Sequence, residues 1–259
     1  MIDGINHSAN TKAITMAEDR KSEDQDDDDY MEEGFQIIVS KPYDHGESVD
    51  RLYEDMTRKL AEVGAPWVPP DILTTPIGKY AGDPVMVAFF KKRGFKKPLN
   101  SFVLSITNRS RREAPEPSSF YDDYLIASYD KLLETQSYQH LVTSIFPKIV
   151  AAFGADAGEL TNGQVSSEDW EVNNASDEIK PEEFFLGKVL RVWAANFWSD
   201  SLCKTAFGPS AADVVKRLQN EVVEARLYRG GALIISSHEE PTADEMRALD
   251  GRIRPLLVT

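Results

Sequence analysis

The sequence predicts an α+β domain, built on a mostly antiparallel sheet with helices packed on it. Residues 222–228 and 232–237 have strand-like composition, and the segment Arg229-Gly230-Gly231 separates them. Glycine pairs supply the positive φ that a tight turn requires, so this stretch predicts a β-hairpin. Ser210 with Asp213, and Thr242 with Glu245, have the spacing of helix capping pairs, which predicts that two helices begin there.

The first predicted elements are a buried strand at residues 35–39 and a helix at residues 48–63. Apolar side chains recur at helical spacing along one face of that helix: Val49, Leu52, Tyr53, Met56, Leu60 and Val63. A proline-rich loop follows. Residues 85–90 and 101–107 then predict a strand pair joined by the basic segment KKRGFKKPLN. We expect this segment to be solvated rather than bound to nucleic acid, because the whole chain is acidic.

The middle of the chain predicts two helices. The first is capped by Ser118 or Ser119 and carries an apolar set: Phe120, Tyr124, Ile126, Leu132 and Leu133. The second spans residues 137–153, and Pro147 within it predicts a kink or a break, because proline lacks an amide hydrogen and clashes with the preceding turn. Residues 154–176 are polar and predict an irregular segment.

The predicted order strand, helix, strand, strand occurs in residues 35–107 and again in residues 188–257. Two similar units therefore fit one sheet, although the two stretches share no repeated residue pattern. We predict a single α+β domain over residues 35–259. Residues 1–34 contain eleven acidic and three basic residues, which predicts a disordered acidic tail because so little apolar surface can be buried.

The chain of 259 residues has a formal net charge of −14, which argues against a protein that binds nucleic acid directly. A partner with a basic surface is the better expectation. The sequence has no run of eighteen apolar residues and no secretory apolar segment at its start, so we expect a cytoplasmic protein without membrane contact. Its one cysteine, Cys203, fits a reducing compartment and is expected to be a buried, inert thiol.

No motif in the sequence predicts catalysis, a cofactor or a metal. The four histidines are scattered along the chain: His7, His45, His140 and His238. The common hydrolase, P-loop and dinucleotide motifs do not occur. Acidic residues near Asp122 leave a hydrolase as an alternative: Asp122, Asp123, Asp130 and Glu134. The first two are explained more simply by the start of the predicted helix, where negative charge complements the helix dipole. We therefore predict that the protein is not an enzyme.

Three segments are candidate contacts for a protein partner. An acidic arm in the tail imitates a nucleic-acid backbone and would dock on a basic cleft. A tryptophan among carboxylates is typical of a binding hot spot, or of a ring tucked under a loop. A tryptophan between prolines is a core plug or a contact anchor. These candidates are Asp26, Asp27, Asp28 and Asp29; Glu168, Asp169, Trp170 and Glu171; and Trp67.

The C-terminal pattern NFWSDSLCKTAFG, PSAADVVKRLQ and ARLYRGGALIISS resembles the end of bacterial polymorphic-toxin immunity proteins, most of all the immunity protein 52 family. The resemblance covers about the last 75 residues clearly, and the first strand and helix loosely. We interpret the matching residues as fold determinants: Phe197, Asp200, Leu202, Cys203, Phe207, Gly208, Leu218, Gly230 and Gly231. The resemblance implies a protein that occludes a nuclease toxin, delivered by a type VI or similar secretion system, in a stoichiometric complex.

Two other classes of function stay open at this point. An effector adaptor or chaperone would bind its partner without abolishing the partner's activity, and a hydrolase would use the carboxylates near Asp122. We predict toxin neutralisation without turnover. Association with a basic nuclease groove would then depend on salt, because charge complementarity raises the association rate.

Overall fold

The structure is a computed structural model, and it describes residues 34–42, 46, 48–78, 85–90, 95–107, 123–133, 136–174, 189 and 191–258. Asp26, Asp27, Asp28 and Asp29 lie outside the described residues, as does the rest of the predicted acidic tail through residue 33. The prediction that residues 1–34 form a disordered tail therefore stays a prediction.

The described chain is organised around one eight-stranded sheet with the strand order β2-β3-β4-β1-β5-β6-β8-β7. Its strands are β1 (Phe35–Lys41), β2 (Val85–Phe89), β3 (Leu99–Thr107), β4 (Asp123–Tyr129), β5 (Ala157–Asn162), β6 (Ala195–Ser199), β7 (Glu224–Tyr228) and β8 (Gly231–Ile235). Every adjacent pair in the sheet is antiparallel. The predicted α+β class with a mostly antiparallel sheet is confirmed.

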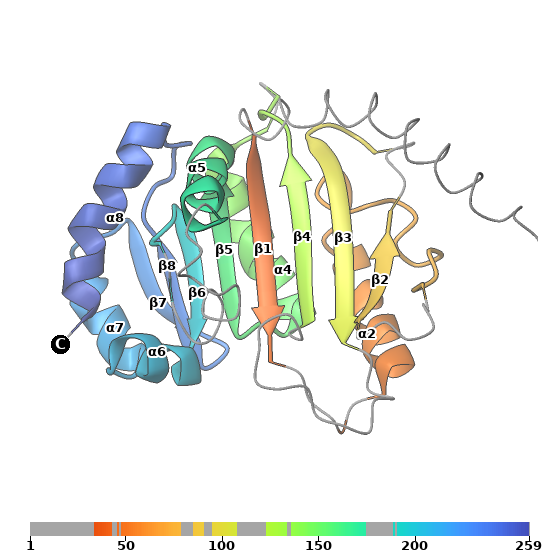
Figure 1. The fold of residues 1–259 in the computed structure, drawn as a ribbon, viewed down its shortest axis with the longest axis horizontal. Helices are drawn as coiled ribbons and strands as arrows, with labels where there is room; N and C mark the ends of the chain where they lie inside the picture. Colours follow the sequence, from red (N-terminus) through yellow and green to blue (C-terminus); the bar gives the residue numbers. More distant parts are fainter. Residues whose placement is uncertain are drawn as a thin grey trace, which may run out of the picture.

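Helices cover one face of the sheet at one end and the opposite face at the other (Figure 1). On the first face, α2 (Val49–Ala61) and α4 (Phe146–Phe153) pack on a core that includes Phe35, Ile37 and Val39 of β1. On the second face a separate core lies over β6 and β8, and includes Trp198 and Ile234. Its helices are α5 (Gly163–Asn174), α6 (Asp200–Phe207), α7 (Ala211–Leu218) and α8 (Ala243–Leu257).

The predicted hairpin and helix caps are confirmed. Arg229 and Gly230 both have positive φ, 49° and 82°, and join β7 to β8. The Ser210 side chain accepts a hydrogen bond from the Asp213 amide at the start of α7. At the start of α8, Thr242 and Glu245 cap each other's amides reciprocally.

The repeated order of elements is present, but the two units differ in strand order. In the first unit α2 connects β1 to the β2–β3 hairpin, and in the second α6 and α7 connect β6 to the β7–β8 hairpin. Strand β4 lies between β1 and β3, whereas β6 pairs directly with β8. The connecting helices also cover opposite faces of the sheet.

The helix predicted after Ser118 and Ser119 is wrong, because residues 123–129 form strand β4. Asp123, Leu125, Ala127 and Tyr129 are buried, and the residues between them are half-buried. This alternation has the period of two that a strand facing a core requires. Asp123 is consequently not in a first helical turn, and the dipole explanation offered for it does not apply.

The irregular segment predicted at residues 154–176 is also wrong, because it contains β5 and α5. Gly158 is closely packed in β5, since a Cβ there would lie 3.0 Å from a methyl of Val150 and would require that side chain to shift. Asn162 then caps α5, its side-chain oxygen accepting a hydrogen bond from the Val165 amide at 3.1 Å. These small and polar residues form regular structure because β5 is paired on both sides, with β1 and β6.

The helix predicted at residues 137–153 is present with the interruption that Pro147 predicts. It consists of α3 (Tyr138–His140), the π-helical turn η3 (Leu141–Ile145) and α4. Proline has no amide hydrogen for the helical ladder, so a wider turn before Pro147 accommodates it.

Candidate functional site

Half of the sheet has one face that no helix of the described residues covers. Strands β2, β3, β4 and β1 pack on α2 and α4 behind them, while α5 to α8 lie over the other half (Figure 1). We call the uncovered side the open face. Its residues with described side chains are Gln36, Ile38, Ser40, Val87, Ser101, Val103, Ser105, Tyr124, Ile126 and Ser128.

The strand register arranges the open face in three rows. The middle row is apolar, with Ile38 opposite Ile126 and Ile126 opposite Val103, all three half-buried. One flanking row contains Gln36, Ser128 and Ser101 in register, and Gln36 donates a hydrogen bond to Ser128 at 3.1 Å. The other contains Ser40 and Tyr124, which are half-buried, and Ser105, which is fully buried. An apolar centre between hydroxyl-bearing rows is the composition of a protein contact surface.

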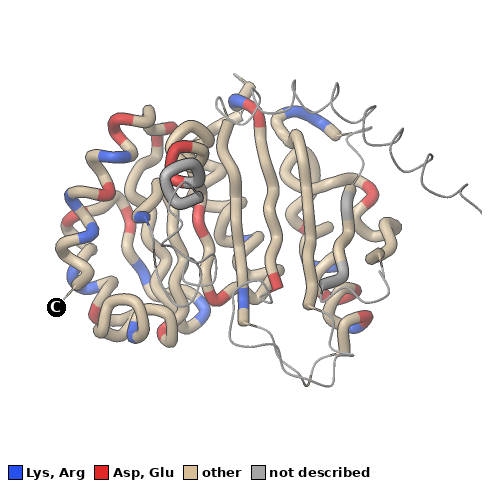
Figure 2. The backbone as a smooth tube through the Cα atoms, viewed as in Figure 1, with Lys and Arg blue, Asp and Glu red and all other residues tan. Residues whose placement is uncertain are grey.

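Charged residues lie at the ends of these strands rather than along them (Figure 2). Lys41 and Asp123 meet at one end, with 3.9 Å between Nζ and Oδ2, and Lys97 and Asp130 lie 3.8 Å apart at the other. The middle of β1, β3 and β4 therefore presents a neutral surface.

Glu159 forms the border of the open face on β5. It is in register with Ile38 of β1 on one side and with Asn196 of β6 on the other. Its side chain is half-buried, and burial raises the pKa of its carboxyl to about 7. A hydrogen bond from Trp193 acts in the opposite direction, and the nearby charge of Asp169 raises the pKa further.

Trp193 is held in position by the segment before β6. Its amide donates to Asn196 Oδ1 at 3.0 Å, and only 5% of the residue is exposed. The Arg191 guanidinium lies 5.6 Å from the centre of the Trp193 ring, within the range of a cation–π contact. No local pattern in the sequence indicates Glu159 or Trp193, because only the folded sheet brings residues 38, 159 and 193 together.

Two of the predicted contact residues, Glu168 and Asp169, belong to a network of ion pairs that joins α5 to α8. Glu168 pairs with Arg247 of α8 at 2.5 Å, and Arg247 lowers the pKa of that carboxyl. Asp169 accepts two hydrogen bonds from Arg191, at 2.7 Å and 2.5 Å. Asp250 of α8 accepts from the Val192 amide at 2.7 Å. These carboxylates link α5 and α8 to each other and to the segment before β6.

Of the other described contact candidates, Trp170 and Glu171 lie in α5 and Trp67 lies in the core. The backbone of Trp170 and Glu171 lies in α5, but their side chains are outside the described part of the chain. Trp67 has 6% of its surface exposed and packs edge-on against Tyr129, with ring centres 6.0 Å apart. Its carbonyl accepts a hydrogen bond from the Tyr129 hydroxyl at 2.8 Å. The described candidates thus do not form one surface.

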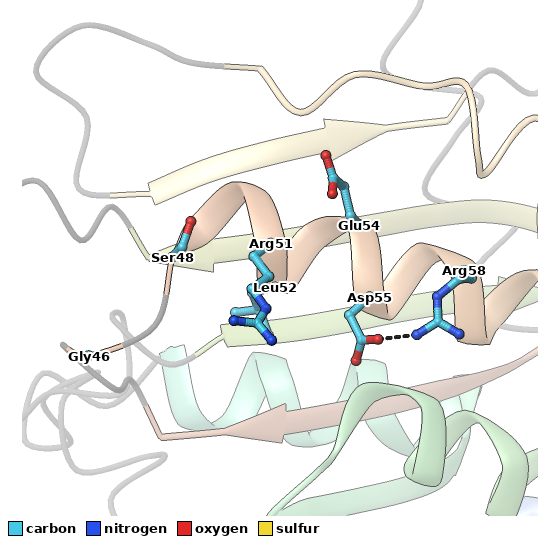
Figure 3. A pocket seen from close by; sticks show the side chains of 7 residues that line it. All are labelled: Gly46, Ser48, Arg51, Leu52, Glu54, Asp55 and Arg58. Carbon is cyan, nitrogen blue, oxygen red and sulfur yellow. Dashed lines mark hydrogen bonds and ion pairs between the residues drawn. The ribbon is translucent and has the colours of Figure 1, made fainter.

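A depression of about 760 Å³ lies along the start of α2 (Figure 3). Its lining residues are Gly46, Ser48, Arg51, Leu52, Glu54, Asp55 and Arg58. Asp55 pairs with Arg58 and with Lys59, the latter at 2.5 Å, and these pairings lower the pKa of Asp55. The lining acids and bases come from successive turns of one helix, and Asp55 pairs along it with Arg58 and Lys59, as on a solvated helix surface.

The two described carboxylates of those considered for hydrolysis, Asp123 and Asp130, do not meet. Asp123 and Asp130 lie at opposite ends of β4, roughly 20 Å apart at the rise of a strand. Asp123 is fully buried and accepts a hydrogen bond from the Thr107 amide at 3.0 Å. Asp122 and Glu134 are outside the described residues.

The described residues contain no group of three or more histidine, cysteine or acidic side chains able to hold a metal ion. Cys203 is buried, as predicted, and burial raises the pKa of its thiol to about 12. Among the described helices, none has the length and apolarity needed to cross a bilayer.

Comparisons with known proteins add a structural similarity. No family model and no curated protein matches the chain. Among solved structures the chain is similar to the Pseudomonas aeruginosa T6SS protein PA0821, with a TM-score of 0.48 and 11% sequence identity. The match covers 86% of this chain and 72% of that chain. The resemblance of about the last 75 residues to the immunity protein 52 family therefore stays a prediction.

Proposed function

We propose that this protein is an immunity protein, which binds a cognate bacterial toxin through the open face and neutralises it by stoichiometric occlusion. The observation that carries this proposal is the open face itself. Strands β1, β4 and β3 present an apolar row of Ile38, Ile126 and Val103 between two hydroxyl-bearing rows, with no helix of the described residues over them. Protein interfaces have this pattern of an apolar centre and a polar rim.

The size of the open face limits how much of the interface it supplies. Four strands at about 4.8 Å spacing and five residues at about 3.3 Å rise give roughly 300 Å². One partner contributes about 800 Å² to an interface of standard size. The toxin would therefore also contact surface next to the open face, and the β5 border with Glu159 is the nearest.

Charge indicates which kind of toxin fits. The net charge is −14, of which −6 remains once the −8 of residues 1–34 is set aside. A nuclease has a basic groove for phosphates, and an acidic inhibitor associates with it faster than a neutral one. We therefore propose a nuclease, delivered by a type VI or similar secretion system, as the cognate toxin.

Co-expression with the toxin encoded beside this gene tests the proposal. The wild-type chain should restore growth, and Ile126→Asp should lose that protection because a charge in the apolar row is costly to bury. Leu73→Asp is the matched control, since Leu73 is an exposed leucine (63%) outside the open face. Circular dichroism should show that both variants are folded.

Two outcomes would contradict parts of the proposal. Full protection by folded Ile126→Asp would exclude the open face as the contact surface. A stable complex that leaves the toxin active would exclude neutralisation and select an effector adaptor, the other binding function that the sequence leaves open.

A further inference from the structure

We propose that Glu159 receives the guanidinium of an arginine from the protein that docks on the open face. This inference rests on the proposed function, and it names the partner's chemistry at one position. Glu159 lies at the end of the apolar row, in register with Ile38. An arginine whose stem lies along Ile38 and Ile126 would bring its guanidinium to this carboxyl.

In the part of the chain that the structure describes, the carboxyl of Glu159 has no paired cation. Among the described residues no lysine or arginine pairs with it, and its one hydrogen-bond donor is Trp193. Arg191, which stacks on Trp193, is already engaged by Asp169 at 2.5 Å and Asp250 at 3.9 Å. An ionised carboxylate accepts several hydrogen bonds, so Glu159 has acceptor capacity left for a bidentate guanidinium.

The surroundings of Glu159 favour an added positive charge. Asp169 on α5 repels the ionised carboxylate, and the neighbours on β1 and β6, Ile38 and Asn196, are neutral. Burial together with this repulsion raises the pKa of Glu159 to about 7. A docked guanidinium supplies the opposite charge that the site lacks, and arginine tolerates partial burial better than lysine because it is more weakly hydrated.

The sign of the pH dependence follows from this pKa. Arginine binds the ionised form of Glu159, so docking lowers the carboxyl pKa and releases a proton. Binding should therefore be tighter at about pH 8, where Glu159 is mostly ionised, than at about pH 6, where it is mostly protonated. Asp169 and Asp250 remain paired with Arg191.

The test uses the full chain and two small probes, acetyl-arginine amide and acetyl-citrulline amide, which differ in charge and hardly in shape. Amide resonances of Ile38 and Ile126 are followed by NMR during titration. At about pH 8 the arginine probe should bind about tenfold more tightly than the citrulline probe, as expected for a charge-assisted hydrogen bond. At about pH 6 this preference should shrink.

Glu159→Gln should abolish the preference for arginine, and Glu168→Gln should leave it unchanged, because Glu168 already pairs with Arg247. Equal binding of the two probes by the wild-type chain, or unchanged arginine binding by Glu159→Gln, would overturn the inference. No toxin takes part, so failure of growth rescue would not affect this result. If the wild-type chain shows no preference for the arginine probe but still restores growth, the proposed neutralisation stands. Only the proposed contact at Glu159 is then excluded.

Discussion

At the residue scale, individual side chains have roles that neighbouring residues in the sequence do not reveal. Glu159 occurs in the polar segment AGELTN, which predicted an irregular segment, yet it lies at the border of a sheet face. Trp67 was open to two interpretations, and its 6% exposure places it in the core. In both cases the deciding contacts come from residues more than thirty positions away, Trp193 and Tyr129.

The raised pKa of Glu159 predicts a pH-dependent stability. Between its ordinary value of 4.5 and about 7, the folded chain binds more protons at Glu159 than the unfolded chain does. The contribution of Glu159 to the free energy of unfolding therefore falls as the pH rises through this window. Glu159→Gln should match the wild type near pH 5 and be about 1–3 kcal/mol more stable near pH 8, by urea denaturation.

Glu168→Gln is a control for which the expected change in the free energy of unfolding has the opposite sign. Arg247 lowers the pKa of Glu168, so its ionised form is the one that folding stabilises. This substitution should destabilise the protein near pH 7, and the difference should disappear as the pH falls below the carboxyl's ordinary value. Parallel pH profiles for wild type and Glu159→Gln would contradict the assignment of a raised pKa to Glu159.

Tyr129→Phe tests the hydrogen bond that anchors the proline-rich loop to the sheet. The Tyr129 hydroxyl donates to the Trp67 carbonyl at 2.8 Å, and the substitution leaves a buried carbonyl without that donor. The cost should be about 1–2 kcal/mol in urea denaturation. Tyr124→Phe is the matched control, because Tyr124 lies on the open face. Equal effects of the two substitutions would contradict a specific role for this hydrogen bond.

At the element scale, the sequence predicted those elements whose cause is local. Paired positive φ values specify the β7–β8 turn, capping pairs begin α7 and α8, and a one-sided apolar stripe forms α2. Strand β4 was predicted as a helix, because its short run of apolar residues fits the period of a helix and that of a strand equally well. Packing against the core decides between the two. Strand β5 and helix α5 were missed because pairing with β1 and β6, rather than composition, makes that segment regular.

Two glycine substitutions should shift stability in opposite directions. A Cβ at Gly231 in β8 would lie 2.5 Å from the Trp198 carbonyl oxygen and 2.8 Å from the Phe197 ring. Gly231→Ala should therefore cost about 1–3 kcal/mol by overpacking. Gly251 in α8 has no atom within 4 Å of such a Cβ, so Gly251→Ala should add about 0.5–1 kcal/mol. Thermal denaturation measures both, and the same sign for both would contradict the close packing of β6 on β8.

At the scale of the whole molecule, the charge is unevenly distributed along the chain, and the helices cover the two faces of the sheet unevenly. The first 34 residues hold −8 of the net charge of −14, and helices cover opposite faces of the sheet at its two ends. This arrangement leaves the open face beside the β5 border with Glu159. The predicted basic partner and the open face thus rest on separate observations, one from composition and one from topology.

The acidic N-terminal segment should be dispensable for stability. A chain of residues 34–259 keeps Gly34, whose carbonyl accepts a hydrogen bond from the Gly163 amide at 2.8 Å. It also keeps both described cores. Its melting temperature should lie within about 2–4 °C of the full chain, which corresponds to about 1 kcal/mol for a domain of this size. A larger decrease, measured by calorimetry, would show that the first 33 residues pack on the domain.

The sequence by itself determined the α+β class, the hairpin, the capped helices and the acidic balance, because each depends on residues within one or two turns of each other or on composition alone. Tertiary structure decided the strand order, the identities of β4, β5 and α5, the open face and the position of Glu159. Whether a strand residue is buried depends on the neighbouring strands as well as on its own segment. Ile38, Ile126 and Val103 form one row only because of the strand register, which no local segment encodes.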